Sequence, residues 1–297
     1  MMKPTPESDR RAIRRKQALE RSDMTGEVFD AAFTRLHGNL YVERTAILPP
    51  RERIAVTARC APDDVVVGGI AAKIMHGGLW HDGDFTIELL RGPDAGNRPG
   101  RGRTVARRTG LTPDDVVEID GIAVTSVVRT AFDLGRVGPP WRALGHLDDL
   151  ARATGFGLDE VRRHAERFAG HRGVRQLREL IPLVDGDAES PPESWVRLLM
   201  HRSELPTPEL QIEVADDDGQ IFARIDLGYV GPMIAIEFDG ADFHTSPAQR
   251  ARDGARDARL RELGWIIIRI DADRLRTDPW GVVMEIERAL RSRGGYF

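Results

Sequence analysis

The sequence predicts an α/β protein whose C-terminal part is a small sheet flanked by helices. Two apolar runs, Gln220–Tyr229 and Met233–Phe238, are typical of strands, and the turn Val230-Gly231-Pro232 between them predicts a hairpin. Pro247–Leu263 predicts a long helix. Trp265–Ile270 is nearly continuously apolar, which indicates a strand buried on both faces. The alternation of strands and helices places this part of the chain in the α/β class.

The flanking segments complete the C-terminal pattern. Ser190 and Pro191-Pro192 introduce a predicted helix over Glu193–Ser203, because proline fits the first turn of a helix. Glu209–Ala215 alternates as a strand does, and Pro279–Arg293 predicts a closing helix. From residue 193 onward, the predicted order of elements is therefore α-β-β-β-α-β-α.

The N-terminal part predicts an α+β region built from short elements. Asp120-Gly121 is a strong hairpin signal, and Ser126 predicts the N-cap of a following helix. The predicted helices are Glu27–Leu36, Pro50–Arg59, Gly68–His76 and Ser126–Asp133. The predicted strands are Leu40–Val42, Phe85–Leu90, Val105–Arg108, Val116–Ile119 and Ile122–Thr125, and Val65–Val67 is a short apolar run.

Composition along the chain predicts five segments. A basic arm (1–22) is either a solvated helix face or a contact for nucleic acid phosphates. The α+β region (23–140) follows, and three helical pieces (141–184) are expected to bridge the two halves. The linker 185–192 is rich in Asp, Gly and Pro. The C-terminal α/β domain (193–297) completes the chain.

Composition favours a protein of the cytoplasm. The chain has 297 residues, of which 41% are hydrophobic and 30% charged, as in an ordinary globular protein. No apolar run approaches the roughly 18 residues of a membrane span. The basic stretch Met1–Arg21 lacks the apolar core of a signal peptide. Cys60, the single cysteine, cannot form an internal disulfide, which favours a reducing compartment. We therefore expect a cytoplasmic protein with no membrane partner.

Carboxylates gather at one end of the predicted hairpin. Asp226 lies in its first strand, and Glu237 and Asp239 lie at the end of its second. Side by side, these three side chains would repel one another unless a divalent cation neutralises them. Carboxylate oxygens are the ligands that Mg²⁺ prefers. The sequence therefore predicts a Mg²⁺ or Mn²⁺ site formed by Asp226, Glu237 and Asp239.

The C-terminal pattern resembles a known superfamily. Asp226 is followed by Phe238-Asp239-Gly240-Ala241-Asp242-Phe243-His244, then by Arg256-Asp257 and by Leu260–Trp265. This order resembles the PD-(D/E)XK nucleases, and within them the Vsr mismatch endonucleases. It is still more similar to largely uncharacterised actinobacterial proteins that carry a Vsr-like domain of unknown function. The resemblance implies a restriction-endonuclease-like αβββαβ core with a mixed four-stranded sheet.

The N-terminal part resembles a second group, the AbiEi-type antitoxins. The matching segments are Leu48-Pro49-Pro50, Gly69–His76, and Gly121-Ile122-Ala123-Val124-Thr125-Ser126 through Arg129-Thr130-Ala131-Phe132-Asp133. In the actinobacterial group such a region often precedes the nuclease-like domain. The resemblance leaves open a protein partner in a repair or toxin–antitoxin system, and it leaves the oligomeric state open.

The acids and one histidine carry the expected chemistry. Asp226 and Glu237 are expected to bind the metal, whereas Asp239 either binds a second ion or orients His244. His244 is expected to be the general acid/base, because an imidazole titrates near neutral pH. Glu193 is expected to reach the metal through water, as the helix acid of the resembled family does.

Two arginines are the residues expected to bind phosphate. Arg252 and Arg256 lie one helical turn apart and are expected to bind the scissile or a neighbouring phosphate. The superfamily's lysine after the second acid is replaced by Asp239. Lysine occurs in the sequence only at Lys3, Lys16 and Lys73.

Each of these residues also has a purely structural interpretation. Asp226 would form an ion pair with Arg224 at a strand edge. Glu193 would stabilise the N-terminus of its helix through the helix dipole. His244 would cap the helix that follows it.

Two functions follow from the sequence. The first is a metal-dependent DNA endonuclease of Vsr-like type, acting on double-stranded DNA in repair or defence. The alternative is a non-catalytic, antitoxin-like DNA-binding regulator with a degenerate nuclease fold. Cleavage of RNA is a third interpretation, because no residue in the pattern identifies a 2′-hydroxyl.

Overall fold

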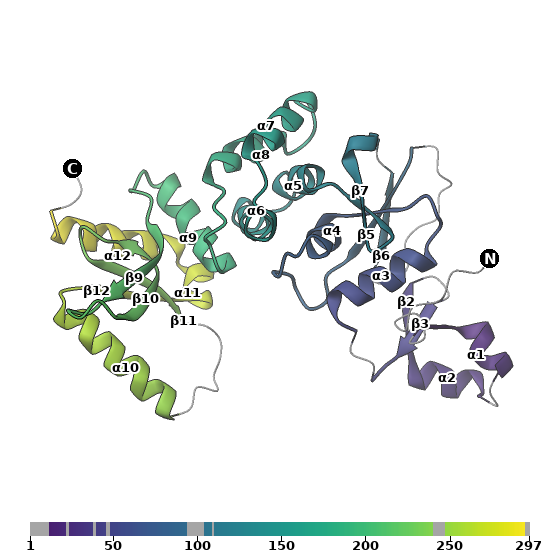
Figure 1. Ribbon diagram of the computed structural model, residues 1–297, viewed down its shortest axis with the longest axis horizontal. Helices are drawn as coiled ribbons and strands as arrows, with labels where there is room; N and C mark the ends of the chain where they lie inside the picture. The colour runs from purple at the N-terminus through teal and green to yellow at the C-terminus, as the bar shows by residue number, and fades with distance from the viewer. Residues whose placement is uncertain are drawn as a thin grey trace. The chain divides into compact units, whose positions relative to one another are not determined.

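The structure is a computed structural model that describes residues 12–21, 24–37, 40–45, 48–93, 104–108, 110–239 and 247–294. Its contacts divide the chain into two compact units (Figure 1). The N-terminal unit comprises residues 1–137 and 153–178, and the C-terminal unit comprises 138–152 and 179–297. The predicted helical segment 141–184 is thus shared between the two units. Within the described ranges, no helix has the length and apolar character needed to cross a membrane.

A small three-stranded sheet of order β1-β3-β2 begins the N-terminal unit. Its strands are β1 (Ala12–Arg14), β2 (Phe33–His37) and β3 (Leu40–Glu43), with helices α1 (Arg15–Arg21) and α2 (Gly26–Ala32). The prediction of one helix over Glu27–Leu36 is wrong, because the chain changes from helix to strand at Phe33. Phe33 stacks on Phe29 at 4.7 Å between ring centroids and pairs with Glu43 of β3. Pairing with β3 and aromatic packing outweigh local helix propensity there.

The main sheet of the N-terminal unit has five strands in the order β6-β5-β4-β8-β7. These are β4 (Val66–Gly68), β5 (Ile87–Arg91), β6 (Thr104–Arg108), β7 (Val116–Ile119) and β8 (Ile122–Thr125). The predicted hairpin at Asp120-Gly121 is confirmed, and both residues have positive φ, 51° and 73°. Turns that match the twist of a hairpin require this conformation, which Asp and Gly tolerate.

The helices between residues 50 and 180 are α3 (Pro50–Cys60), α4 (Gly69–Met75), α5 (Val127–Gly135), α6 (Pro140–Thr154), α7 (Leu158–Arg167) and α8 (Val174–Leu180). They belong to the N-terminal unit, except for most of α6 and the end of α8, which belong to the C-terminal unit. Ser126 caps α5, since its side chain accepts from the Arg129 N–H at 3.3 Å. The three helical pieces predicted over 141–184 correspond to α6, α7 and α8.

The C-terminal unit contains the predicted mixed four-stranded sheet, in the order β12-β11-β10-β9 (Figure 1). Its strands are β9 (Glu209–Ala215), β10 (Ile221–Tyr229), β11 (Ile234–Asp239) and β12 (Ile266–Asp271). Its helices, besides most of α6, are α9 (Pro191–Arg202), α10 (Pro247–Glu262), α11 (Ala272–Thr277) and α12 (Pro279–Ser292). Strands β9, β10 and β11 are antiparallel, and β12 runs parallel to β11 after the α10 crossover. The α/β fold class and the restriction-endonuclease-like strand order are therefore confirmed.

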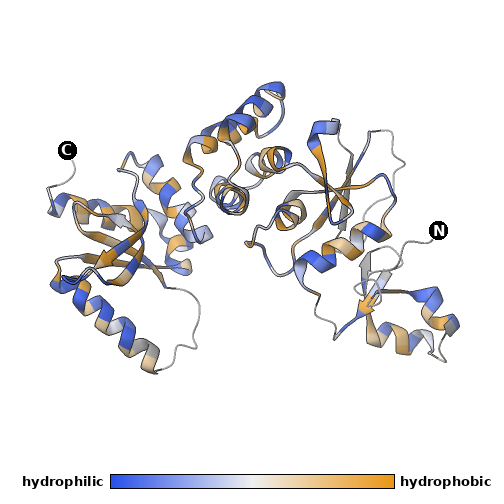
Figure 2. Ribbon diagram, in the orientation of Figure 1, coloured by the Kyte–Doolittle hydropathy of each residue, from blue (hydrophilic) through white to orange (hydrophobic). Residues whose placement is uncertain are grey.

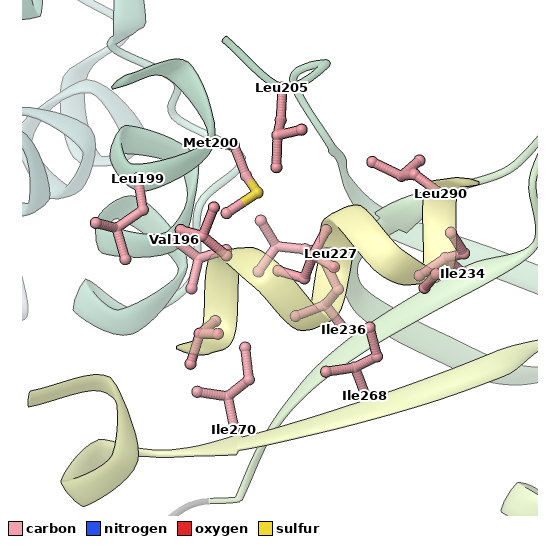
Figure 3. Close-up of a cluster of buried hydrophobic side chains, with 14 of the residues drawn as sticks. Val196, Leu199, Met200, Leu205, Leu227, Ile234, Ile236, Ile268, Ile270 and Leu290 are labelled. Atoms are coloured by element: carbon pink, nitrogen blue, oxygen red, sulfur yellow. The ribbon is translucent and has the colours of Figure 1, made fainter. Parts of the chain in front are cut away.

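Apolar packing fixes the two central strands. Helices α9 and α12 and the sheet share one buried cluster (Figure 3), which includes Val196, Met200, Leu227, Ile234, Ile236, Ile268, Ile270 and Leu290. A second cluster joins Leu260 of α10 to Ala235 and Ile225. Ile234 and Ile236 belong to the first cluster and Ala235 to the second, as alternation along a strand requires. In Figure 2 these strands are largely orange, because few polar side chains lie on them.

Candidate functional site

The hairpin of β10 and β11 places two acids side by side. Leu227 pairs with Ile236, so Asp226 and Glu237 lie one step further along the same ladder. The backbone N–H of Phe238 donates to Asp226 Oδ2 at 3.1 Å, which holds the carboxyl against β11. The charge of Asp226 also contributes to raising the pKa of Glu237. The predicted convergence is thus observed for this pair.

Glu237 is a buried carboxyl with an uneven environment. Its side chain is 5% exposed, and burial raises its pKa although two arginines oppose the shift. Glu237 Oε2 lies 2.6 Å from Arg256 Nη2 and 3.0 Å from Arg269 Nη2. Glu237 Oε1 is buried and has no hydrogen-bond partner. Burying a polar atom without a hydrogen-bond partner costs free energy, so a ligand bound to this oxygen would stabilise the site.

Glu193 lies at the start of α9 and faces Asp226. Its carboxylate accepts from Ser190 Oγ at 2.7 Å and from the Glu189 N–H at 2.9 Å, so it does serve the helix N-terminus. Burial is the main cause that raises its pKa, and the charge of Asp226 adds to the shift. The structural and the functional interpretation of Glu193 are therefore compatible.

Gln211 is a neighbour that the sequence did not reveal. Its Nε2 donates to Glu193 Oε2 at 3.1 Å, and its buried Oε1 has no partner. Gln211 also has φ of 51°, which is unusual for a residue inside a strand. Backbone strain of this kind gathers at functional sites. No pattern in the sequence signals it, because alternation in β9 looks regular at this position.

Arg269 of β12 is the second residue that sequence reasoning missed. It is the register partner of Glu237 across the parallel pair β11–β12. Its guanidinium also donates to Asp239 at 2.7 Å and to both carboxyl oxygens of Asp257, at 2.8 and 2.9 Å. These carboxylates raise the pKa of Arg269 even though burial opposes the shift. A charged residue inside the apolar run Ile266–Ile270 was the available signal.

The remaining predicted residues have different positions. Asp239 is 52% exposed and is bound to Arg269. Arg252 lies on α10 and is exposed. His244 lies outside the described residues, so its role stays a prediction. Arg224, the partner considered for Asp226, instead pairs with Glu189 at 2.9 Å.

Asp226 and Glu237 are the two described acids that could share a metal ion. Within the part of the chain that the structure describes, no three Asp, Glu, His or Cys side chains are arranged to hold a metal ion. Mg²⁺, however, usually keeps several waters and binds through one or two carboxylates together with substrate phosphates. Asp226 and Glu237 fit that smaller role, because Glu237 Oε1 has no partner. The third predicted ligand, Asp239, is bound instead to Arg269.

Comparisons with known proteins show which family the chain belongs to. Residues 209–290 match the family model REase_MTES_1575, a restriction-endonuclease-like family. Two Mycobacterium tuberculosis proteins are 33% identical to the chain over 239 residues, covering 78% of this chain and 86% of each relative. They are Uncharacterized protein MT2308 of strain CDC 1551 / Oshkosh and Uncharacterized protein Rv2248 of strain H37Rv.

A solved structure was also matched. The crystal structure of the RV2827C protein from Mycobacterium tuberculosis aligns with a TM-score of 0.38 and 13% identity, over 71% of this chain and 86% of that chain. The chain belongs to the same family as the two 33% identical Mycobacterium tuberculosis proteins, and its residues 209–290 form a restriction-endonuclease-like domain.

Proposed function

We propose that this protein is a metal-dependent DNA endonuclease of Vsr-like type that hydrolyses phosphodiester bonds in DNA repair or in defence against foreign DNA. The observation that carries the proposal is the pair Asp226–Glu237 on adjacent strands, with Glu237 Oε1 buried and unpartnered. A protein that used this sheet only as a scaffold would gain stability from an apolar residue at position 237. Perturbed, desolvated carboxylates of this kind are typical of active sites.

Asp226 and Glu237 are the residues that would hold Mg²⁺ or Mn²⁺. When bound, such an ion polarises the phosphoryl group and lowers the pKa of a water molecule, which then acts as nucleophile. Glu193, next to Asp226, would bind a water molecule of the same site. Asp239, which pairs with Arg269, would orient His244 or bind a second ion.

Basic residues of the site would bind and orient the DNA backbone. Arg256, 2.6 Å from Glu237, is within reach of a phosphate held between the two acids. Arg252 is one turn away on the same helix and would contact a neighbouring phosphate. His244 remains the proposed general acid/base, because an imidazole can protonate the leaving oxygen at neutral pH.

A second function is favoured by one observation. Arg256 and Arg269 both form ion pairs with Glu237 Oε2. Among the described residues, no three side chains are arranged to bind a metal ion. This arrangement also suits a non-catalytic DNA-binding regulator, in which ion pairs have replaced the metal. The resemblance of the N-terminal sequence to AbiEi-type antitoxins is compatible with that alternative as well.

Incubation of supercoiled plasmid with the protein and Mg²⁺ or Mn²⁺ separates the two functions. The nuclease proposal expects nicked or linear DNA, which disappears with EDTA and in Asp226→Asn and Glu237→Gln variants. Asp216→Asn is the matched control, because Asp216 lies in the β9–β10 turn and pairs with Arg259 at 3.1 Å.

The possible results have distinct meanings. Cleavage that persists in Asp226→Asn would contradict the assigned site. DNA binding without cleavage under either metal would favour the regulator. A parallel reaction with single-stranded and structured RNA tests whether the substrate is RNA.

A further inference from the structure

The arginine pair Arg256 and Arg269 closes one side of Glu237. Arg256 Nη2 donates a hydrogen bond to Oε2 at 2.6 Å, and Arg269 Nη2 forms an ion pair with the same oxygen at 3.0 Å. Two positive charges therefore already face Oε2. Only Oε1 is left for another ligand. In this state only one of the two carboxylate oxygens of Glu237 is available to a metal ion.

The same pair places positive charge against the site. A divalent cation between Asp226 and Glu237 would lie next to two guanidinium groups and would be repelled by them. Two further acids, Asp239 and Asp257, offset part of this charge by pairing with Arg269. The arginines neutralise Glu237 Oε2 in the absence of a metal ion, and their positive charge opposes the entry of one.

The arginine pair is accessible to an anion from solvent. The Arg256 and Arg269 side chains are 29% and 35% exposed, and β12 is the edge strand of the sheet. Guanidinium groups bind phosphate oxygens in pairs of parallel hydrogen bonds, as strongly as they bind carboxylates. A DNA phosphate that reaches the site therefore offers both arginines an alternative anion, and Glu237 Oε2 is then released.

We infer that the arginine pair couples DNA binding to metal uptake: backbone phosphates draw Arg256 and Arg269 away from Glu237, and the released carboxylate then binds the divalent cation. The inference rests on the proposed function, whose site it uses. Because coupling between two ligands is reciprocal, the metal must strengthen DNA binding by the same factor by which DNA strengthens metal binding. Free protein binds the cation weakly, so the site assembles only on its substrate.

Calorimetry with Ca²⁺ tests the coupling without relying on activity. Ca²⁺ is a hard cation that seeks carboxylate oxygens, as Mg²⁺ does. It is titrated into the full-length protein alone and into the protein saturated with a short DNA duplex, and a gel confirms that the duplex is intact. We expect Ca²⁺ affinity to rise by about 5- to 150-fold with DNA, the usual range of such coupling. Anisotropy of the labelled duplex, with and without Ca²⁺, must give the same factor.

Two variants test whether the arginine pair is the cause. Arg256→Gln leaves Asp257 bound to Arg269, so its folding is not at risk from an unpaired buried acid. It should bind Ca²⁺ more tightly than the wild type in the absence of DNA, and DNA should add less. The double variant Arg269→Gln/Asp257→Asn removes the second arginine together with the charge of its main partner. It should also bind Ca²⁺ more tightly than the wild type in the absence of DNA.

Arg259→Gln is the control, because it removes a charge from the same helix. Arg259 pairs with Asp216 and stacks on Phe222. The coupling factor should be unchanged in this variant.

The outcomes separate this inference from the nuclease proposal. Equal Ca²⁺ affinity with and without duplex would overturn the coupling and leave the nuclease proposal intact. A coupling factor unchanged in Arg256→Gln and in the double variant would overturn the role of the arginine pair. Ca²⁺ uptake that is undetectable in both states would overturn the metal site itself, and with it both proposals.

Discussion

Glu237 and Arg269 are register partners on the parallel strands β11 and β12, and the guanidinium of Arg269 lies 3.0 Å from the Glu237 carboxylate. The contact joins two residues separated by the whole of helix α10. It places a positive charge next to the acid pair, in a part of the sequence that has no lysine.

Arg269→Gln should reduce the dependence of DNA binding on salt. If Arg269 contacts one phosphate, the slope of log affinity against log salt concentration should fall by about 1, and affinity should drop to a similar degree for all sequences. Fluorescence anisotropy between about 50 and 200 mM salt measures both quantities. Arg291→Gln, an exposed arginine on α12 that pairs with Glu287, controls for net charge. An unchanged slope in a folded Arg269→Gln variant would assign Arg269 to structure alone.

Asp148 should make stability depend on pH. It is fully buried, and burial raises its pKa to about 7, although it lies 2.9 Å from Arg197 and accepts from the Asp185 N–H. The folded state therefore holds a proton that the unfolded chain releases near pH 4. The stabilisation is complete below about pH 4 and is lost as pH rises to about 7, by an amount on the order of 4 kcal/mol.

The comparison of Asp148→Asn with the wild type checks this sign. The variant cannot titrate, so its melting temperature should gain on that of the wild type as pH rises from 5 to 8. Asp187→Asn, in an exposed turn, should follow the wild type throughout. Parallel pH profiles for Asp148→Asn and wild type would show that Asp148 is charged in the folded state.

Gly228→Ala should disrupt the hairpin that carries the acids. A Cβ on Gly228 would lie 2.2 Å from the carbonyl oxygen of Ile234, which is backbone and cannot move away freely. Overpacking of this kind costs about 1–3 kcal/mol, so we expect a lower melting temperature and loss of plasmid nicking. At Gly231, in the turn, a Cβ would meet no atom within 4 Å. Gly231→Ala should therefore retain stability, and equal loss in both variants would contradict the steric explanation.

Ile236→Ala should destabilise the C-terminal unit more than any change on its surface. Ile236 of β11 is fully buried in the cluster that the sheet shares with α9 and α12 (Figure 3). The cavity left by Ile236→Ala should reduce the free energy of unfolding by about 2–5 kcal/mol, and Ile236→Val should reduce it by about 0.5–1.5 kcal/mol. Met284, 58% exposed on α12, is the apolar control, with an expected change below about 0.5 kcal/mol for Met284→Ala. Urea unfolding followed by circular dichroism measures the series. Losses of stability that follow the size of the removed side chain, with Met284→Ala as damaging as Ile236→Ala, would contradict the cavity argument.

The sequence by itself determined the four strands of the C-terminal unit and one half of its candidate site, whereas the short helix α11 was not predicted. The predicted strands at Glu209–Ala215 and Met233–Phe238 differ from β9 and β11 by at most one residue at each end. Their limits are set by local features, such as alternation, turns and proline. The pairing of Asp226 with Glu237 is also local, because a short turn joins their strands and leaves few other registers.

Only the tertiary structure decided which residues complete that site. Arg269 and Asp257 meet Glu237 because α10 returns the chain to a parallel strand, and the register of such a pair depends on how the helix packs. The helix-to-strand change at Phe33 was likewise decided by the tertiary structure, since pairing with Glu43 of β3 outweighs the local preference. Local sequence fixes conformations of adjacent residues, whereas contacts across a crossover are selected by the free energy of the whole packed core.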